Sequence, residues 1–397
     1  MAGCVRLVWN KALALQKSNC EYINQQFNLL GGKAMGAAEA KQLKKVLYTQ
    51  FWVNGNAISV KALVAVWKKS EELHFLNDCP SQALQKPLAD LDKSFFKCFT
   101  KAGGFPRFKK KGNHDSIHFP QGFKIDGSKL YIPKLGWVKF FKSSNIVGEI
   151  KSVTVSSDGL GNWFAAIAVE QDNIVLDRVG SEIGIDVGIS KFAACSDGTF
   201  EYSPKPYTSL RKRLKILQRA VARKKKTSNN RKKAQKKVTK LHARIANIRK
   251  DFLHKTSTKL SKNHAMIVVE DLKISNMSSS ASGTMEKPGV NVSAKSGLNR
   301  SILDQGWGEF RRQLKYKQEW SGGIFVAVNP KHTSQTCNEC GYVDKSNRLT
   351  QSHFVCLSCG HKSNADTNAA KNILRAGHVR LACGDIELSS SSPGILL

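Results

Sequence analysis

Residues 337–374 read CNECGYVDKSNRLTQSHFVCLSCGHKSNADTNAAKNIL, which is two CxxC pairs followed by an Ala-rich helical segment that begins with an acid. Fifteen residues separate the pairs, a glycine follows each pair, and the four cysteines are Cys337, Cys340, Cys356 and Cys359. Tetrahedral Zn²⁺ takes four thiolates, and the glycines let the backbone curl around the metal. The spacing predicts a structural zinc ribbon. Because four thiolates close the coordination sphere, any chemistry must come from other residues.

Three acids lie within or at the end of a predicted strand or helix. Asp186 interrupts the apolar strand GIDVG, Glu270 ends the strand MIVVE, and Asp366 begins the helix after the ribbon. For each acid alone two interpretations are open, since an unpaired carboxylate in a strand is costly but Asp in caps and turns is common. Together they follow the order in which an RNase H-like fold gathers three carboxylates. This order predicts a site for two Mg²⁺ ions that hydrolyses phosphodiesters.

The overall charge points to a polyanionic partner. The 397 residues include 63 Lys and Arg against 30 Asp and Glu, for a net charge of +33, and 41% are hydrophobic. A chain of this size and composition can bury several cores. An excess of positive charge this large favours nucleic acid as the partner.

The sequence also disfavours a membrane or secretory role. No long apolar run or adjacent polybasic segment suggests membrane association, and the N-terminal stretch MAGCVRLVWNKALALQ lacks a small-residue cleavage pattern. Six of the ten cysteines are scattered without a disulfide pattern, which favours a reducing compartment. We expect a cytoplasmic protein without a membrane partner.

The most basic segment lies between Arg211 and Lys262, where 21 Lys and Arg residues accompany one acid, Asp251. Apolar residues recur there at steps of three and four in two stripes joined by the turn TSNN: Leu210, Leu214, Leu217 and Val221, then Val238, Leu241, Ile245, Ile248 and Phe252. This spacing predicts an antiparallel helical hairpin. Because almost no acid is available for ion pairs, we expect its basic surface to contact phosphates.

The remaining segments have clear local patterns. Residues 1 to about 110 have helical spacing, with predicted core positions at Leu88, Leu91, Phe95, Phe96 and Phe99. The following loop GGFPRFKKKG either holds a nucleic-acid backbone or is a solvated turn with two anchoring rings. Short apolar segments over 117–170 predict a small antiparallel sheet or barrel. The Ser- and Gly-rich stretch 276–297 is predicted to be mobile, and a helix is expected from about Arg300 to Trp320.

The motifs GIDVGI, VVEDLKISNM, TSQTCNECG, FVCLSCG and ADTNAAKNIL resemble, in this order, the TnpB (OrfB) family of insertion-sequence transposons. Members of that family are RNA-guided DNA endonucleases with a split RuvC domain, and they are related to type V CRISPR effectors. The resemblance covers nearly the whole chain, to about Gly384. It implies that Asp186, Glu270 and Asp366 are catalytic acids that bind Mg²⁺. It also implies two partners, a guide RNA derived from the transposon end and double-stranded target DNA.

The resemblance further implies an α/β multidomain chain with an RNase H-like (RuvC) core, an inserted Cys4 zinc ribbon, a helical recognition region and a β-barrel-like wedge region. The expected boundaries are 1–110 for the recognition region, 111–175 for the wedge, 176–207, 263–330 and 363–380 for the RuvC parts, 208–262 for the basic hairpin, 331–362 for the ribbon and 381–397 for a flexible tail. Family members carry a further strand and helix start ahead of GCVRLVWN. We therefore expect the start of the wedge to be missing here.

Two other functions compete with cleavage. A guide-bound repressor would bind DNA without cutting it, but the presence of Asp186, Glu270 and Asp366 disfavours this, since loss of one acid suffices to inactivate a nuclease. A transposase that joins strands can share the RNase H fold. Such a transposase would act on element ends without a guide. Dependence on guide RNA therefore distinguishes an RNA-guided endonuclease from a transposase.

Overall fold

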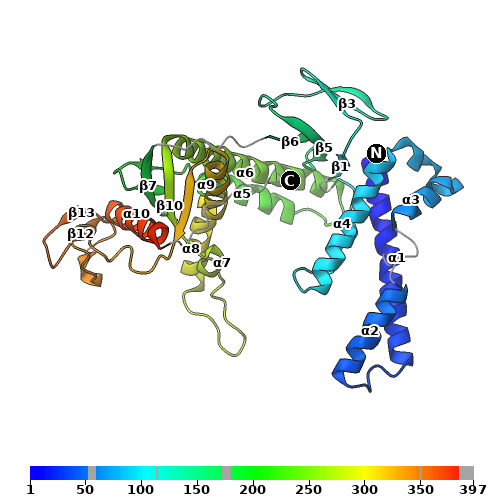
Figure 1. Cartoon of the computed structure of the whole chain (residues 1–397), viewed down its shortest axis with the longest axis horizontal. Coiled ribbons are helices and arrows are strands. Elements are labelled where there is room, and N and C mark those ends of the chain that lie inside the picture. Colours follow the sequence, from blue (N-terminus) through cyan, green and yellow to red (C-terminus); the bar gives the residue numbers. More distant parts are fainter. Residues whose placement is uncertain (52–59, 113–114, 172–179, 349, 384–397) are drawn as a thin grey trace. The chain divides into compact units, whose positions relative to one another are not determined.

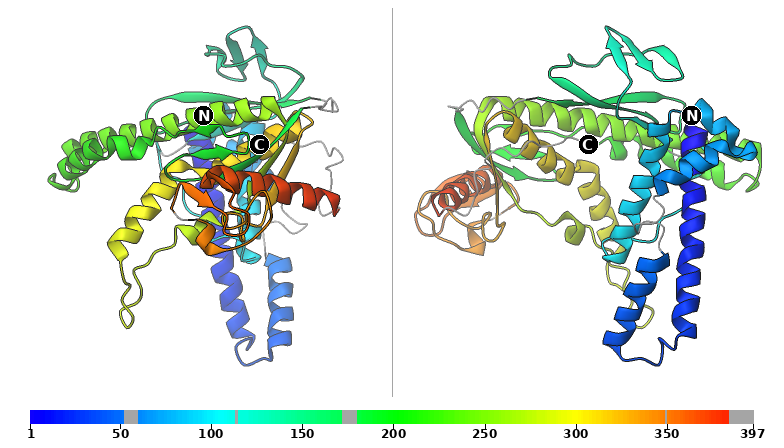
Figure 2. Two further views of the ribbon diagram at one scale, coloured as in Figure 1. Left: turned by 90° about the vertical axis from the view of Figure 1, so that its left-hand side faces the viewer. Right: turned by 45° about the vertical axis from the view of Figure 1, so that its right-hand side comes forward.

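The computed structural model describes residues 1–51, 60–112, 115–171, 180–348 and 350–383 (Figures 1 and 2). The chain divides into two compact units, residues 1–171 and 172–393. Each unit has its own hydrophobic core. Among the described residues, no helix combines the length and the apolar character that crossing a membrane requires.

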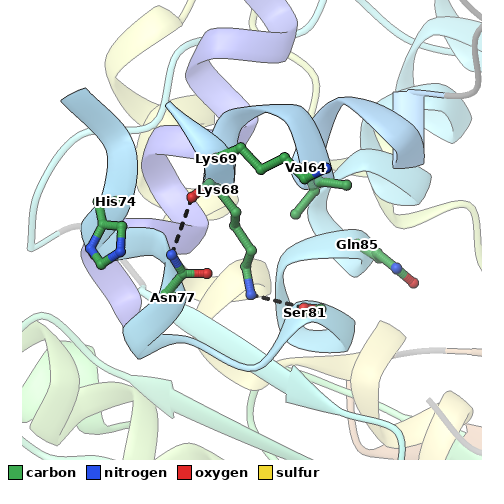
Figure 3. A pocket seen from close by; sticks show the side chains of 8 residues that line it. Val64, Lys68, Lys69, His74, Asn77, Ser81 and Gln85 are labelled. Atoms are coloured by element: carbon green, nitrogen blue, oxygen red, sulfur yellow. Dashed lines mark hydrogen bonds between the residues drawn. The ribbon is translucent and has the colours of Figure 1, made fainter. Parts of the chain in front are cut away.

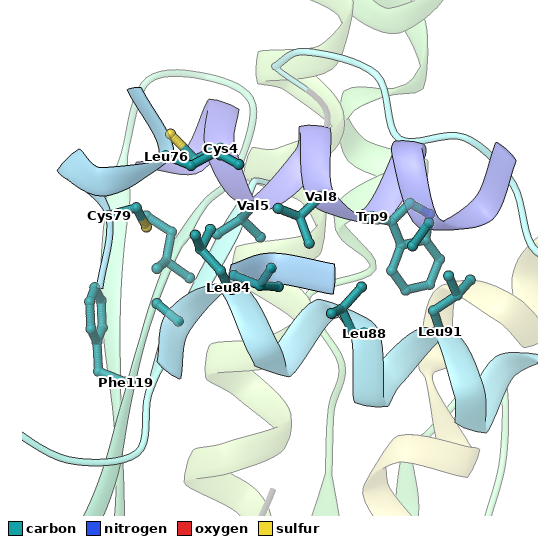
Figure 4. Close-up of a cluster of buried hydrophobic side chains, with 14 of the residues drawn as sticks. Cys4, Val5, Val8, Trp9, Leu76, Cys79, Leu84, Leu88, Leu91 and Phe119 are labelled. Atoms are coloured by element: carbon teal, nitrogen blue, oxygen red, sulfur yellow. The ribbon is translucent and has the colours of Figure 1, made fainter. Parts of the chain in front are cut away.

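The first unit begins with helices, as its apolar spacing predicts. They are α1 (Ala2–Leu29), α2 (Ala37–Phe51), α3 (Val60–Lys69), the 3₁₀ helix η1 (Glu71–Asp78) and α4 (Ser81–Phe99). The core lies between α1 and α4, where Val8, Leu84 and Leu88 are fully buried (Figure 4). Two core predictions are wrong, because Phe96 is 68% exposed and Phe99 50% exposed. Phe96 lies one position off the buried stripe of α4, and Phe99 stacks against Phe95 near the helix end.

The strands of the first unit form two antiparallel sheets. One has the order β1 (Ser116–Phe119), β5 (Glu149–Ser157), β6 (Trp163–Glu170), and the other has β2 (Lys124–Asp126), β3 (Lys129–Ile132), β4 (Gly136–Lys139). The predicted antiparallel strands are present, but among the described residues they divide between two open three-stranded sheets and close no barrel. β2, β3 and β4 have only three or four residues each and pair among themselves, which separates them from the sheet that contains the longer β5 and β6.

The second unit is built on a five-stranded mixed sheet in the order β11–β10–β7–β8–β9. Its strands are β7 (Ser181–Val187), β8 (Ala193–Cys195), β9 (Phe200–Glu201), β10 (His264–Glu270) and β11 (Ile324–Val328). β7 to β9 form an antiparallel meander, while β10 and β11 run parallel to β7. The carboxyl ends of the three parallel strands therefore meet at one edge of the sheet.

Helices cover both faces of this sheet (Figure 1). α10 (Ala365–Ala382) packs on one face, while α6 (Asn229–Asn263) and α9 (Trp307–Trp320) pack on the other. Gly184 permits the close approach of α10, because a Cβ at this position would lie 2.1 Å from the carbonyl oxygen of Ala370. This contact sets the second and third turns of α10 against β7.

The predicted basic hairpin is present as α5 (Pro206–Ala222) and α6, which lie side by side and extend away from the sheet (Figure 2). Both predicted stripes meet in one cluster up to Ile245, whereas Phe252 packs into the core of the sheet. Ser228 caps α6, so the last two residues of the predicted TSNN turn belong to the helix. Buried Asp304 accepts the backbone N–H groups of Tyr207 and Thr208 and thereby anchors the start of α5.

The remaining elements are α7 (Ile274–Met277), α8 (Val292–Gln305), η2 (Lys345–Asn347), β12 (His353–Val355) and β13 (Lys362–Asn364). The helix expected from about Arg300 starts earlier, within the predicted mobile stretch, and Gly306 divides it into α8 and α9. Gly306 has φ +77°, which no continuous helix allows. α10 continues to Ala382, past the predicted start of the tail, and residues 384–397 lie outside the described residues.

Candidate functional sites: a carboxylate cluster and a Cys4 cluster

The three predicted acids face the same side of the central sheet. Gly184 of β7 and Val268 of β10 both contact α10. Side chains alternate along a strand, so Asp186 and Glu270, each two residues further on, also face α10. Asp366 lies in the first turn of that helix. The structure therefore brings the three acids to one region, which we call the carboxylate cluster.

Asp186 carries the largest electrostatic perturbation in this cluster. Burial, followed by the negative charges of Glu270 and Asp366, raises the pKa of Asp186 from 3.8 to about 7, while Arg348 acts in the opposite direction. The carboxylates are thus close enough to repel one another. A cation between them would relieve that repulsion.

Two basic side chains contact Asp366. Its Oδ1 accepts a hydrogen bond from Arg348 Nη2 at 3.2 Å, and its Oδ2 lies 3.4 Å from Lys191 Nζ. Asn364 caps α10 by accepting the backbone N–H groups of Asp366 and Thr367. These contacts fix the carboxylate at the positive end of the helix dipole.

Glu270 and Asp271 are adjacent in sequence but face opposite sides of the sheet. Glu270 Oε1 accepts a hydrogen bond from Thr333 Oγ1 at 2.5 Å. Burial raises the pKa of Glu270, and the Thr333 hydroxyl opposes that shift. Asp271 pairs instead with Arg311 of α9 and is largely exposed. Only the first of the two acids belongs to the carboxylate cluster.

The Cys4 cluster is more compact than the carboxylate cluster. Four sulfur atoms lie within 4.8 Å of one another, those of Cys337, Cys340, Cys356 and Cys359. Within the described parts of the chain, no other His, Cys, Asp or Glu group places three or more donor atoms this close together. The three carboxylates therefore do not converge to that distance. Two metal ions about 3.5–4 Å apart do not require it, because each ion takes its own subset of oxygens.

Two equivalent backbone turns build the Cys4 cluster. The N–H of Gly341 donates to Cys337 O and that of Gly360 donates to Cys356 O, each at 3.0 Å. Both glycines have positive φ, +77° and +72°, as the turn requires. Backbone N–H groups of the second turn point at the Cys356 thiol and lower its pKa, whereas the pKa of neighbouring Cys359 is raised, so Cys356 is the thiol of this pair that ionises first.

Buried Asn347 joins the two cysteine turns. Its Nδ2 donates to Gln335 O at 3.0 Å and to Tyr342 O at 3.3 Å beside the first turn. Its Oδ1 accepts the backbone N–H of Leu357 in the second turn at 3.0 Å. The ribbon is therefore held together by hydrogen bonds as well as by its four converging thiols.

The excess positive charge of the basic hairpin is concentrated in residues 206–248, which we call its distal half. Between Pro206 and Ile248 the sequence has sixteen Lys and Arg and no acid. Among the described residues, the ion pairs of the hairpin all lie nearer the sheet: Arg249 with Asp304, Lys255 with Asp251, and Lys259 with Glu201. The distal half thus presents positive charge to solvent, as a phosphate-binding surface would.

Two surface pockets are lined by residues other than the three acids. A 610 Å³ pocket of the first unit lies among α3, η1 and α4, where Lys68 Nζ donates to Ser81 Oγ at 2.8 Å (Figure 3). A second pocket, of 870 Å³, lies beside α7 and the end of β11 and includes Asp271 and Lys273. Neither pocket contains an acid of the carboxylate cluster.

Three residues of the carboxylate cluster were not predicted from the sequence. Lys191 follows β7, Thr333 follows β11, and Arg348 lies between the two CxxC pairs. Each reaches an acid from a different element. Lys345 and Arg348 both lie between the CxxC pairs, and nothing in the sequence distinguishes the one that reaches Asp366. No local pattern marks Lys191 or Thr333, because their partners are distant in sequence.

Comparisons with known proteins agree with this architecture. The family models that match are "Probable transposase" of the OrfB_IS605 type over residues 166–281, "Cas12f1-like, TNB domain" over 307–373 and "Helix-turn-helix domain" over 1–22. A solved structure titled "Cryo-EM structure of the Cas12f1-sgRNA-target DNA complex" matches with a TM-score of 0.51 at 14% identity, over 93% of this chain and 81% of that one. The fold and the sites thus define an α/β multidomain protein of Cas12f1-like fold with a Cys4 cluster.

Full-length relatives identify the family. The protein named "Putative RNA-guided DNA endonuclease InsQ" of Escherichia coli K12 is 46% identical over 97% of this chain and 89% of its own length. A "Putative RNA-guided DNA endonuclease" of Streptomyces pristinaespiralis is 34% identical over 96% and 86%. The chain belongs to the OrfB (TnpB) family, which is related to type V CRISPR effectors, and this prediction from the motifs is confirmed.

Proposed function

We propose that the chain is an RNA-guided DNA endonuclease that hydrolyses phosphodiesters at an RNase H-like (RuvC) carboxylate site. The observation that carries the proposal is the convergence of Asp186, Glu270 and Asp366 on the α10 side of the sheet. The strand order β11–β10–β7–β8–β9 supports an RNase H-like core. The names of the full-length relatives support the same class of activity.

The carboxylate cluster fits Mg²⁺. Its donors are hard carboxylate oxygens, and burial together with the negative charges of Glu270 and Asp366 raises the pKa of Asp186, so a cation there would stabilise the charged carboxylate. Asp186, Glu270 and Asp366 would hold two ions. When bound, such ions lower the pKa of an attacking water and stabilise the leaving 3′-oxygen. Arg348 and Lys191 hold Asp366, and Thr333 holds Glu270, so that the acids are in place for binding.

The Cys4 cluster fits a structural Zn²⁺. Its four thiols converge and leave no position for a substrate in a tetrahedral shell, so it supports the fold and takes no part in hydrolysis. The ribbon is attached to the start of α10, where Asp366 lies. We therefore assign the ribbon the role of a scaffold for the carboxylate cluster.

The decisive experiment replaces Asp186, Glu270 or Asp366 by Ala in protein copurified with its RNA. Each variant should lose Mg²⁺-dependent cleavage of a matching double-stranded target while RNA and DNA binding remain near those of the wild type. Sequencing the copurified RNA tests whether the guide derives from the transposon end. If all three variants still cut, the nuclease proposal is wrong. Strand joining without RNA would instead indicate a transposase. If the wild type bound guided targets without cutting them, the result would indicate a repressor.

The distal half of the basic hairpin is proposed to contact nucleic-acid phosphates. Exposed Lys232 and Lys236 have no ion pair in the described structure, whereas Lys255 and Lys259 each face a carboxylate. Replacing Lys232 and Lys236 by Gln should flatten the slope of log affinity against log salt by roughly 1.4–1.8. The matched pair Lys255→Gln and Lys259→Gln should change it less. Equal slopes for both pairs and the wild type would show that the distal half is merely solvated.

A further inference from the structure

The short segment between β11 and the first cysteine turn contacts the carboxylate cluster through one hydroxyl group. Thr333 in this segment is 8% exposed, and its Oγ1 lies 2.5 Å from Glu270 Oε1 and 3.1 Å from Pro330 O. A hydroxyl has a single hydrogen to donate. The shorter contact to a charged carboxylate is the stronger one, so Glu270 takes this hydrogen.

Two buried asparagines of α10 hold this segment in place. Asn372 Nδ2 donates to Thr333 O at 3.0 Å and to Thr336 O at 2.6 Å. Asn368 Nδ2 donates to Thr336 O at 2.7 Å, and its Oδ1 accepts the backbone N–H of Asn338 at 3.0 Å. Asn368 and Asn372 are 0% and 7% exposed and lie one turn apart on the same face of the helix.

These contacts connect three parts of the second unit. The helix that carries Asp366 holds the segment by its backbone, and the segment in turn holds Glu270 by a side chain. The same segment runs directly into Cys337 of the Cys4 cluster. A bond to Oε1 also restricts rotation of the Glu270 carboxylate, whose Oε2 has no hydrogen bond among the described residues. One oxygen is thus fixed by the protein while the other remains available to a cation.

We propose that Thr333 is a positioning residue for Glu270, and that Asn368 and Asn372 hold Thr333 on the helix that bears Asp366. Through this arrangement the acids of β10 and α10 keep a fixed spacing. The proposal rests on the proposed function, because it concerns metal binding by the same carboxylates. Groups that orient metal ligands in this way change metal affinity or activity by about 10–100-fold when they are removed.

The test uses the full chain loaded with its copurified RNA and two variants at one position. Thr333→Val removes the hydroxyl but keeps the shape of the side chain, whereas Thr333→Ser keeps the hydroxyl. We measure single-turnover cleavage against Mg²⁺ concentration, and we measure Mn²⁺ binding without DNA by electron paramagnetic resonance. Thr333→Val should weaken Mn²⁺ binding and raise the Mg²⁺ requirement by about 10–100-fold. Thr333→Ser should stay close to the wild type in both.

Zinc content and thermal unfolding separate positioning from folding. Both variants should keep the zinc content of the wild type and a similar melting temperature, since valine fills the same space. If Thr333→Val binds Mn²⁺ and cuts like the wild type while Glu270→Gln does neither, the positioning role is wrong and the nuclease proposal stands. If the wild type neither binds Mn²⁺ nor cuts, both proposals fail. A Thr333→Ser variant as impaired as Thr333→Val would show that packing, and not the hydroxyl, is what matters.

Discussion

The Cys4 cluster and the carboxylate cluster reach their geometry by different routes. The thiols are brought together by two short turns, each closed by one backbone hydrogen bond and a glycine with positive φ. The carboxylates come from β7, β10 and α10, which are distant in sequence, and burial, together with the negative charges of Glu270 and Asp366, raises the pKa of Asp186 to about 7. Local turns can preform a metal site without the metal. A cluster of like charges depends on packing around it and on cations within it.

The largest effect should come from breaking the Cys4 cluster itself. Cys356→Ser removes one of four thiolates, and zinc binding by such sites contributes about 10–16 kcal/mol in small zinc domains. We expect zinc content to fall from one per chain to near zero and the ribbon to become sensitive to protease. Cleavage should fall as well, because the first cysteine turn is bonded to α10 through Asn368. Metal analysis and limited proteolysis measure the two outcomes.

Cys383→Ser is the matched control, since Cys383 is an exposed cysteine at the end of α10, outside the cluster. It should leave zinc content and cleavage unchanged. Unchanged zinc content in Cys356→Ser would contradict the four-thiolate site.

A smaller effect should come from moving α10 off the sheet. A Cβ at Gly184 would meet Ala370 O at 2.1 Å and Leu374 N at 2.7 Å, both backbone atoms of α10. Overpacking of this kind costs about 1–3 kcal/mol, which corresponds to about 2–4 °C in melting temperature per kcal/mol for a unit of this size. Gly184→Ala should lower the melting temperature and impair cleavage, because Asp366 shifts relative to Asp186. Zinc content should not change.

Gly308→Ala provides the comparison for that variant. Gly308 lies in α9, and a Cβ there would meet no atom within 4 Å. Alanine should be neutral or stabilise the helix by about 0.5–1 kcal/mol. If both alanine variants behave alike, the close approach of β7 and α10 does not control the carboxylate cluster.

The pH dependence of stability should reveal the raised pKa of Asp186, which results from burial and from the nearby charges of Glu270 and Asp366. Without added Mg²⁺, folded Asp186 keeps its proton up to about pH 7, whereas an unfolded Asp loses it near 3.8. The folded state therefore binds more protons between these values, so its stability falls as pH rises from about 4 to 7. The slope approaches about 1.4 kcal/mol per pH unit for this one group.

Urea unfolding at pH 5, 6 and 7 measures this slope, without chelator so that zinc is retained. Asp186→Asn carries no titrating group and should show a shallower fall than the wild type. Added Mg²⁺ should also reduce the fall in the wild type, because a cation compensates the charge that the proton otherwise removes. Parallel pH profiles for the wild type and Asp186→Asn would contradict the raised pKa.

Features set by neighbours in sequence could be predicted from the sequence. The CxxC spacing fixes the cysteine turns, strand alternation fixes which way Glu270 and Asp271 face, and steps of three and four place Leu214 and Val238 in one interface. Each depends only on residues within a turn or two. The order of the three acids added a family pattern, from which their convergence followed.

Features set by distant contacts could not be predicted. Arg348 and Lys191 meet at Asp366 because the ribbon and the β7–β8 turn approach the same helix end. Phe96 was expected in the core on spacing alone, but no element covers that side of α4 in the described residues. Gly306 divides the helix that was expected from about residue 300. A single glycine within an otherwise helical pattern does not by itself predict a break, because helices tolerate isolated glycines.

The smallest effect should come from Asp271, the neighbour of Glu270 on the other face of the sheet. Its ion pair with Arg311 is roughly half exposed, so its removal should change stability by less than about 1 kcal/mol. Asp271→Ala should therefore cut at nearly the rate of the wild type, with unchanged zinc content and Mg²⁺ requirement, whereas Glu270→Ala should not cut. Paired cleavage assays decide this, because the two acids differ only in the face they occupy. If Asp271→Ala were inactive and Glu270→Ala active, the register of β10 against the carboxylate cluster would be wrong by one residue.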